Sequence, residues 1–196
     1  LSADGGVLLW IQDVLRCAVL DPVLMVYTQL GNAGILWIAL SLLMLCWPRT
    51  RKAGFVSLIA MLLGLLCTNV ALKHLVGRAR PWLTVEGLIP LVAEHDPNSF
   101  PSGHTCAAFA AASAWCRTLP RRWMKVTAVV MAALMGFSRL YVGVHFPSDV
   151  LAGMAGLGGI TCGGERQSRF CGTGRSACCA APERRTGKRC STTSGG

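Results

Sequence analysis

Ala53–Leu72 reads AGFVSLIAMLLGLLCTNVAL, a run of 20 residues without a charged side chain. An α-helix needs about 20 apolar residues to cross the hydrocarbon core of a bilayer, so this run predicts a membrane-spanning helix. The composition favours the same interpretation, because 53% of the 196 residues are hydrophobic and only 14% are charged. We therefore expect an all-α integral membrane protein.

Further apolar stretches on both sides of this run predict a bundle of about five to six helices in one domain, residues 1–156. Membrane helices are expected at about 33–47, 53–73, 104–118 and 124–142, and an incomplete last helix at 147–160. Residues 7–27 carry an apolar stripe, which predicts a first helix that either lies in the membrane interface or crosses the bilayer. Residues 1–10 have neither a basic leader nor a small-residue cleavage site, so we expect no signal peptide there.

The net charge of +10 comes largely from the C-terminal tail and from two loops between apolar runs. The basic loop residues are Arg49, Arg51 and Lys52 in the first loop, and Arg117, Arg121, Arg122 and Lys125 in the second. The positive-inside rule assigns both loops to the cytoplasm, so residues 73–104 and 139–149 are expected on the extracytoplasmic face of the cell membrane. This distribution explains the charge without a nucleic-acid partner.

Residues 161–196 differ in composition from the rest of the chain, because Arg, Ser, Thr, Gly and Cys predominate and no hydrophobic periodicity is visible. Five of the ten cysteines lie between Cys162 and Cys190, but their spacing matches no common set of zinc ligands. We expect this tail to be disordered or to result from a shifted reading frame.

Two cations follow the membrane run directly. Lys73 and Arg80 are seven residues apart, which is about two helical turns, so both point to one side if the helix continues that far. Arginine offers a planar fork to two phosphate oxygens and lysine offers a compact charge, so the pair can neutralise a bound phosphate. The alternative is that both cations only anchor a helix end at the membrane interface.

The segment Pro101-Ser102-Gly103-His104 has the pattern of a helix start. Ser102 can cap the helix, Gly103 lets a ligand approach the backbone, and the free amides of a first helical turn bind anions. An ordinary capped helix would share this pattern, but it would not need His104.

A third group of polar residues surrounds the end of the last long apolar run. Arg139 and His145 are six residues apart, so they face one site only if the helix ends between them, which Gly143 and Pro147 favour. His145 and Asp149 are four residues apart, so the carboxylate can reach one ring nitrogen and leave the other as a nucleophile. A buried structural histidine–aspartate pair is the alternative.

Together these residues supply a nucleophile, a group that orients it, a second histidine as general acid, and cations for a developing negative charge. Phosphoryl transfer depends on positioning and on electrostatic stabilisation, and this set offers both without a metal or another cofactor.

Three segments are similar to the signature motifs of the type 2 phosphatidic acid phosphatase superfamily, in order and in spacing. They are Lys73 with Arg80-Pro81; Pro101-Ser102-Gly103-His104; and Ser138-Arg139 with His145 and Asp149. The resemblance covers about residues 7–156 and is greatest to the small bacterial membrane lipid phosphatases, including undecaprenyl diphosphatases. It implies the helical bundle of the type 2 phosphatidic acid phosphatase and vanadium haloperoxidase type.

The resemblance also implies an activity and a role for each matching residue. The substrate would be a lipid phosphate or diphosphate, first of all undecaprenyl diphosphate, with phosphatidylglycerophosphate or phosphatidic acid as alternatives. His145 would attack phosphorus and form a phosphohistidine, His104 would protonate the leaving group, and Asp149 would assist the nucleophile. The implied phosphate-binding residues are Lys73, Arg80, Ser102, Gly103 and Arg139.

Two other interpretations remain open at this point. One is vanadate-dependent haloperoxidase chemistry in the same kind of pocket, and the other is a non-catalytic membrane protein that binds anionic lipid. Arg78 lies outside the motif and receives no role from the resemblance.

Overall fold

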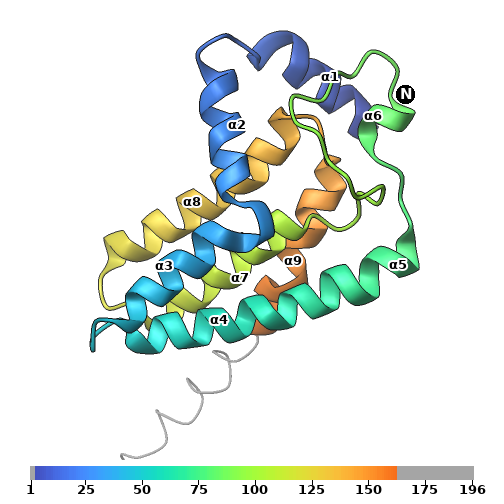
Figure 1. The fold of residues 1–196 in the computed structure, drawn as a ribbon. Helices are drawn as coiled ribbons and strands as arrows, with labels where there is room; N and C mark the ends of the chain where they lie inside the picture. Colours follow the sequence, from blue (N-terminus) through green and yellow to red (C-terminus); the bar gives the residue numbers. More distant parts are fainter. Residues whose placement is uncertain (1–2, 163–196) are drawn as a thin grey trace, which may run out of the picture. The chain divides into compact units, whose positions relative to one another are not determined.

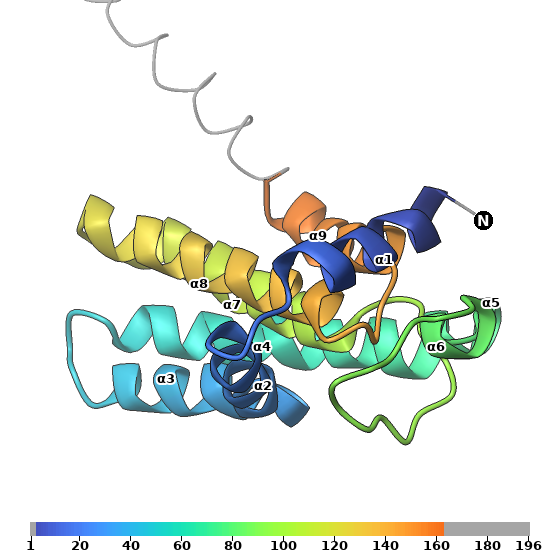
Figure 2. The ribbon, with the colours of Figure 1, turned by 90° about the horizontal axis from the view of Figure 1, so that it is seen from above.

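A central helix, α7 (Gly103–Thr118), organises the part of the chain that the structure, a computed structural model, describes, residues 3–162. It packs against α4 (Arg51–Leu65), α8 (Arg122–Tyr141) and α9 (Pro147–Cys162), while α3 (Ile35–Leu45) packs beside α4 (Figures 1 and 2). Residues 3–162 contain no β-strand, which confirms the expected all-α class.

The alanine-rich sequence of α7 explains its central position. Its fully buried alanines include Ala108, Ala110, Ala111 and Ala114. Such small side chains let neighbouring helices approach on several sides, which is the usual means of close packing between membrane helices.

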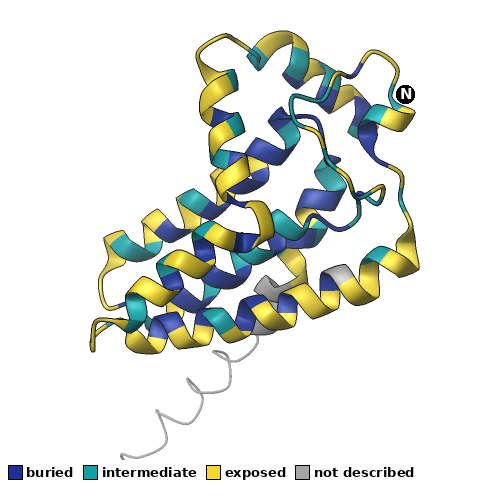
Figure 3. Cartoon of the chain, viewed as in Figure 1, coloured by how far each residue is buried: buried dark blue, intermediate teal, exposed yellow. Residues whose placement is uncertain are grey.

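Helix α4 has two faces of different character. Small residues with helical spacing, Ala53, Ser57, Ala60 and Gly64, are buried in the bundle. Large apolar residues are exposed on the outer face, among them Phe55, Ile59 and Leu63 (Figure 3). Hydrocarbon chains of a bilayer would cover this outer face, so the exposed pattern is that of an integral membrane protein.

Two helices within residues 3–162 are long and apolar enough to cross a membrane, Arg51–Val76 and Arg122–Tyr141. The first of them includes α4, a π-helical segment η2 (Leu66–Leu72) and α5 (Lys73–Val76). A third span results if α2 (Leu20–Leu30) and the segment Asn32–Leu45, which are bent by 54° relative to each other, cross together. The short turn η1 (Asn32–Gly34) forms this bend.

The N-terminal region differs from the single helix expected over residues 7–27, because it forms two helices, α1 (Ala3–Leu15) and α2. The chain turns at Arg16, whose guanidinium donates to the carbonyl oxygens of Tyr141 at 3.1 Å and Ile89 at 2.6 Å. Gln12 also donates to the carbonyl of Gly87 at 3.0 Å. Helix α1 is therefore fastened to the end of α8 and to the loop formed by residues 85–101.

The helix that contains Lys73 does not continue to Arg80. It ends at Val76, and Gly77 adopts a left-handed conformation with φ 56°, which glycine tolerates without strain. Arg80 then precedes a short helix, α6 (Pro81–Thr84). The condition under which one helix would carry both cations is therefore not met, and a turn brings Lys73 and Arg80 to the same cavity.

The bundle has two distinct ends (Figure 1). The basic turns between α3 and α4 and between α7 and α8 lie at one end, and the loop of residues 85–101 lies at the other. The tail expected to be disordered or frameshift-derived was residues 161–196; Thr161 and Cys162 belong to α9, and the rest of the tail lies outside the described residues.

Candidate active site

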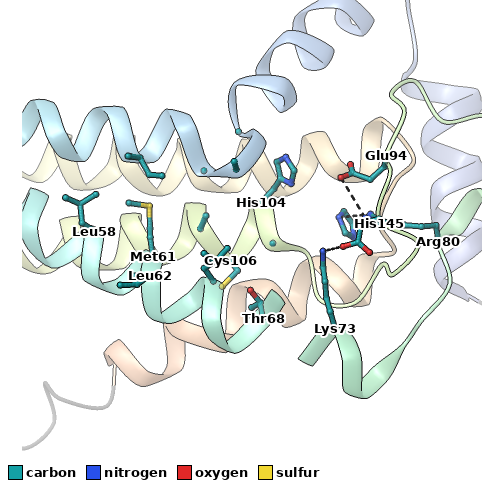
Figure 4. Close-up of a pocket in the computed structure, with 18 residues that line it drawn as sticks. Leu58, Met61, Leu62, Thr68, Lys73, Arg80, Glu94, His104, Cys106 and His145 are labelled. Atoms are coloured by element: carbon teal, nitrogen blue, oxygen red, sulfur yellow. Dashed lines mark hydrogen bonds and ion pairs between the residues drawn. The ribbon is translucent and has the colours of Figure 1, made fainter. Parts of the chain in front are cut away.

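A cavity of about 360 Å³ lies between α3, α4 and α7 and reaches the end of the bundle that carries the loop of residues 85–101 (Figure 4). At one end, which we call the polar end, it is lined by Lys73, Arg80, Glu94, Asp96, Gly103, His104 and His145. The remainder, which we call the apolar arm, is lined mainly by Ile38, Leu58, Met61, Leu62, Leu65 and Ala107. Residues of all three sequence motifs thus meet in one cavity.

An adjoining cavity of about 710 Å³ shares Glu94, Asp96 and His104 with the first, and it adds Asn32 and Arg139 to the lining. Arg139 therefore lies beside the polar end, and its phosphate-binding role stays a prediction.

His145 occupies the turn between α8 and α9. Helix α8 ends at Tyr141, and Gly143 turns the chain with φ 78°, so the expected helix break between Arg139 and His145 is present. Arg80 Nη1 lies 3.1 Å from His145 Nε2. A guanidinium can only donate, so Nε2 accepts this hydrogen bond and carries no proton. The ring proton of neutral His145 is therefore on Nδ1.

The second ring nitrogen of His145 faces Asp149. The distance from Nδ1 to Asp149 Oδ2 is 3.7 Å, and Nδ1 has no hydrogen-bond partner within the described part of the chain. Both side chains are buried. The protonated nitrogen of His145 therefore faces a carboxylate, and its unprotonated nitrogen contacts Arg80, which also lines the cavity.

Burial lowers the pKa of His145 to about 4; Asp149 opposes this shift, and the positive charges of Arg139 and Arg80 add to it. His145 is consequently neutral near pH 7, which is the state that a nucleophile requires.

Ser102 has a different place from the one expected of a phosphate ligand. It caps α7, as the sequence predicted, because its hydroxyl accepts a hydrogen bond from the Thr105 amide at 3.4 Å. Its own amide donates to the carbonyl oxygen of Asp149 at 3.1 Å. Ser102 is fully buried and lines neither cavity, so it joins the start of α7 to Asp149, while Gly103 and His104 line the polar end.

His104 has a partner that the sequence interpretation missed. Its Nε2 lies 2.8 Å from Oδ1 of Asn32, in the bend between α2 and α3. The sequence signal was the polar interruption at Gly31 and Asn32 in an otherwise apolar run. That interruption fixes a bend, but its distance from His104 along the chain gave no reason to connect the two.

Two carboxylates of the loop formed by residues 85–101 face the cations of the site. Glu94 accepts a hydrogen bond of 2.5 Å from Arg139 Nη2 and lies 3.8 Å from Arg80 Nη2, while Asp96 forms an ion pair with Lys73. Each cation expected to bind phosphate is therefore paired with an internal anion. The sequence analysis assigned no role to Glu94 or Asp96.

The electrostatics of Glu94 reflect this arrangement. Burial alone would raise the pKa of its carboxyl group, but the charge and hydrogen bond of Arg139, together with Arg80, lower it below the ordinary value. Glu94 is therefore charged at neutral pH. Among residues 3–162, no group of three or more His, Cys, Asp or Glu side chains is placed to hold a metal ion.

The fold and the three motifs define a class, and the chain belongs to it: the PAP2 superfamily, whose family model matches residues 54–164. This membership confirms the resemblance inferred from the motifs. The chain is 33% identical over 130 residues to an undecaprenyl-diphosphatase of Sulfolobus acidocaldarius, which covers 66% of this chain and 62% of that protein. It is also 31% identical over 143 residues to undecaprenyl-diphosphatase BcrC of Bacillus subtilis, covering 70% of this chain and 69% of BcrC.

A solved structure is similar over most of the chain. It is the crystal structure of a transmembrane PAP2 type phosphatidylglycerolphosphate phosphatase from Bacillus subtilis, with a TM-score of 0.66 and 29% sequence identity. The similarity covers 85% of this chain and 86% of that one, which confirms the expected fold type.

Proposed function

We propose that this protein is a membrane lipid phosphatase that hydrolyses a lipid phosphate or diphosphate, with undecaprenyl diphosphate as its first substrate. The observation that carries the proposal is the lining of the cavity of about 360 Å³. Its polar end offers Lys73, Arg80 and His145 to a phosphate group, and its apolar arm offers a hydrocarbon surface to the adjoining chain. A cavity that joins these two surfaces suits a phosphate ester of an apolar alcohol.

The residues of the polar end fit the steps of phosphoryl transfer. His145 Nε2 attacks phosphorus while the bond from phosphorus to the leaving oxygen breaks, and His104 gives that oxygen its proton. A bound phosphate brings negative charge beside His104, which favours the protonated imidazole. Asp149 stabilises the positive charge that His145 acquires. Water then attacks the phosphohistidine, His104 takes the proton of the water, and inorganic phosphate leaves.

The cations have the complementary role in this mechanism. Lys73, Arg80 and Arg139 neutralise the charge that develops on the phosphate oxygens, which is the largest contribution a protein makes to this kind of reaction. For them to do so, the carboxylates of Glu94 and Asp96 must give way to the phosphate.

We place the site at the extracytoplasmic face. Support comes from the two basic turns, which lie at the opposite end of the bundle from the polar end and are typical of cytoplasmic loops (Figure 1). The apolar arm extends from the polar end past Met61 and Leu62 toward Leu58, which is closer to those turns along α4 (Figure 4). A lipid tail in this arm would point into the bilayer.

The undecaprenyl-diphosphatases among the relatives favour undecaprenyl diphosphate, and the similar structure makes phosphatidylglycerophosphate the second candidate. The test is phosphate release by detergent-purified protein in excess chelator. The substrates are undecaprenyl diphosphate, phosphatidylglycerophosphate and phosphatidic acid, and His145→Ala is the control. Chelator-resistant release that disappears in the variant is the expected result. No release from any of the three lipids by folded protein would refute the proposal and favour a non-catalytic lipid-binding role.

A further inference from the structure

Arg78 is the cation of this region that the sequence motif leaves without a role, and the structure places it against Asp149. Its Nη1 donates to Asp149 Oδ1 at 2.8 Å and to the Ser148 hydroxyl at 2.6 Å. The other oxygen, Oδ2, accepts the amide of Phe146 at 2.9 Å and faces His145. The two oxygens of Asp149 therefore have separate partners.

Besides Asp149 and Ser148, two further groups contact the guanidinium of Arg78. Nη2 donates to Asp4 of α1 at 3.1 Å, and Asp4 also accepts a hydrogen bond of 2.5 Å from Ser148. The guanidinium carbon lies 4.0 Å from the centre of the Phe146 ring. A side chain fixed in this way can fix the carboxylate that it contacts.

We propose that Arg78 is a positioning residue for the reaction: by binding Oδ1 of Asp149 it directs Oδ2 toward Nδ1 of His145. The inference rests on the proposed function, because it concerns the same nucleophile. Asp149 is fully buried, and a buried carboxylate without a cationic partner either takes up a proton or turns toward another donor. In either state it stabilises a positively charged His145 less well.

A direct contact between Arg78 and the phosphate is a different role, and the geometry does not favour it. Arg78 lines neither cavity, whereas Arg80 and Lys73 line the polar end. A purely structural role is the second alternative. The side chain of Arg78 is 31% exposed, so a substitution there does not open a cavity in the core.

The test measures kcat and KM for undecaprenyl diphosphate in detergent micelles with the full chain and five variants. These are Arg78→Ala, Arg78→Lys, Asp149→Asn, the double variant of Arg78→Ala with Asp149→Asn, and Glu86→Gln as the control at an exposed residue that lines neither cavity. Loss of an orienting carboxylate costs a comparable histidine-dependent enzyme up to ~10⁴-fold in kcat. Arg78 acts one contact further away, so Arg78→Ala should lower kcat by about ten- to a hundredfold, with KM changed by less than about threefold.

Two comparisons separate positioning from the other roles. Arg78→Lys should recover part of kcat, because it keeps the charge. In the Asp149→Asn background, Arg78→Ala should cost less than about threefold, since two residues that act through one contact are not additive. Glu86→Gln should stay within about threefold of the unmodified protein. Additive losses in the double variant, or a raised KM with an unchanged kcat, would overturn the proposal.

A spectroscopic measurement decides the matter without turnover. The ¹⁵N chemical shifts of histidine-labelled protein report the tautomer of His145, whose signal is assigned by its absence in His145→Ala. We expect Nδ1 protonated and Nε2 bare in both proteins, because Arg80 still donates to Nε2, and we expect the Nδ1 shift to move in Arg78→Ala as Asp149 turns away from it. An unchanged Nδ1 shift would overturn the inference. Absence of phosphate release by the unmodified protein would instead refute the proposed function.

Discussion

Replacing Glu94 by glutamine should make the site bind inorganic phosphate more tightly. In the structure the carboxylate of Glu94 contacts Arg139 at 2.5 Å and lies 3.8 Å from Arg80, so it occupies the position of an anion between two cations. A phosphate that binds there must first displace this carboxylate. Glutamine has a similar size and can still accept a hydrogen bond, but it carries no charge and competes less.

The size of the effect follows from the contact that the phosphate has to replace. A hydrogen bond between charged groups contributes about 1.5 to 3 kcal/mol. The Glu94 side chain is 23% exposed, so solvent screening reduces this to about 1 to 2 kcal/mol. Since 1.4 kcal/mol corresponds to a factor of ten, Glu94→Gln should lower the Kd for phosphate by about five- to thirtyfold.

The pH range of this effect has a definite sign. The pKa of Glu94 is lowered from its ordinary value of 4.5, because the cations outweigh the effect of burial. The contribution of the charged pair to stability is therefore complete above the ordinary value and disappears only as the pH falls through the lowered one. The difference between the variant and the unmodified protein should accordingly be fully developed at neutral pH.

Phosphate binding is best measured in detergent, from the thermal protection that increasing phosphate gives to each protein. Glu86→Gln is the matched control, because Glu86 belongs to the same loop but is exposed and lines neither cavity. If Glu94→Gln binds phosphate no more tightly than Glu86→Gln does, the carboxylate is not a competitor and this reasoning is refuted.

Three further predictions concern the nucleophile, a cation and the helix packing. His145 should remain an active nucleophile down to acid pH, because burial lowers its pKa to about 4. A pH profile of kcat/KM should therefore fall only as the pH drops through about 4. A fall near 6.5, the ordinary pKa of histidine, would contradict this prediction. Arg139→Lys should lower kcat/KM by about ten- to a hundredfold, because Arg139 contacts Thr28 and Glu94 through two different nitrogens, whereas lysine has a single side-chain nitrogen. Near-normal rates would show that one of these contacts suffices. Gly153→Ala should lower the free energy of unfolding by about 1 to 3 kcal/mol, because a Cβ there would lie 2.7 Å from the Ser102 carbonyl oxygen. The measurement is thermal unfolding, and Gly156→Ala is the control, because a Cβ at Gly156 would have nothing within 4 Å. Equal stability of the two variants would contradict the packing argument.

The sequence predicted helices at 53–73 and 124–142, and the structure has helices there that are long and apolar enough to span a membrane. The helix at 104–118, also expected to span, is α7, which has 16 residues and is not among the candidate spans of the described residues. The sequence could not predict the relative position of Lys73 and Arg80, since the helix stops at Gly77 and the approach depends on a turn. The division of residues 7–27 into two helices was equally inaccessible, because Arg16 binds backbone carbonyls that are remote in sequence.

Within the site, spacing along the chain predicted the pairs whose members are close in sequence. His145 and Asp149 are the best example, because one helical turn determines their approach. The partners Glu94, Asn32 and Arg78 were missed or left unassigned for the opposite reason. Each of them reaches the site from a different segment, and only the packed bundle brings those segments together.

The 3.1 Å contact between Arg80 and His145 lowers the reactivity of His145 before a substrate binds. The lone pair of His145 Nε2, which would attack phosphorus, accepts a hydrogen bond from the Arg80 guanidinium. In that state it reacts less readily with metal ions or other electrophiles. An arriving phosphate offers Arg80 stronger acceptors, so the guanidinium turns to its oxygens and uncovers the nitrogen. In the proposed mechanism, binding and reactivity are therefore coupled, because the phosphate that His145 attacks is also the group that draws Arg80 away from His145.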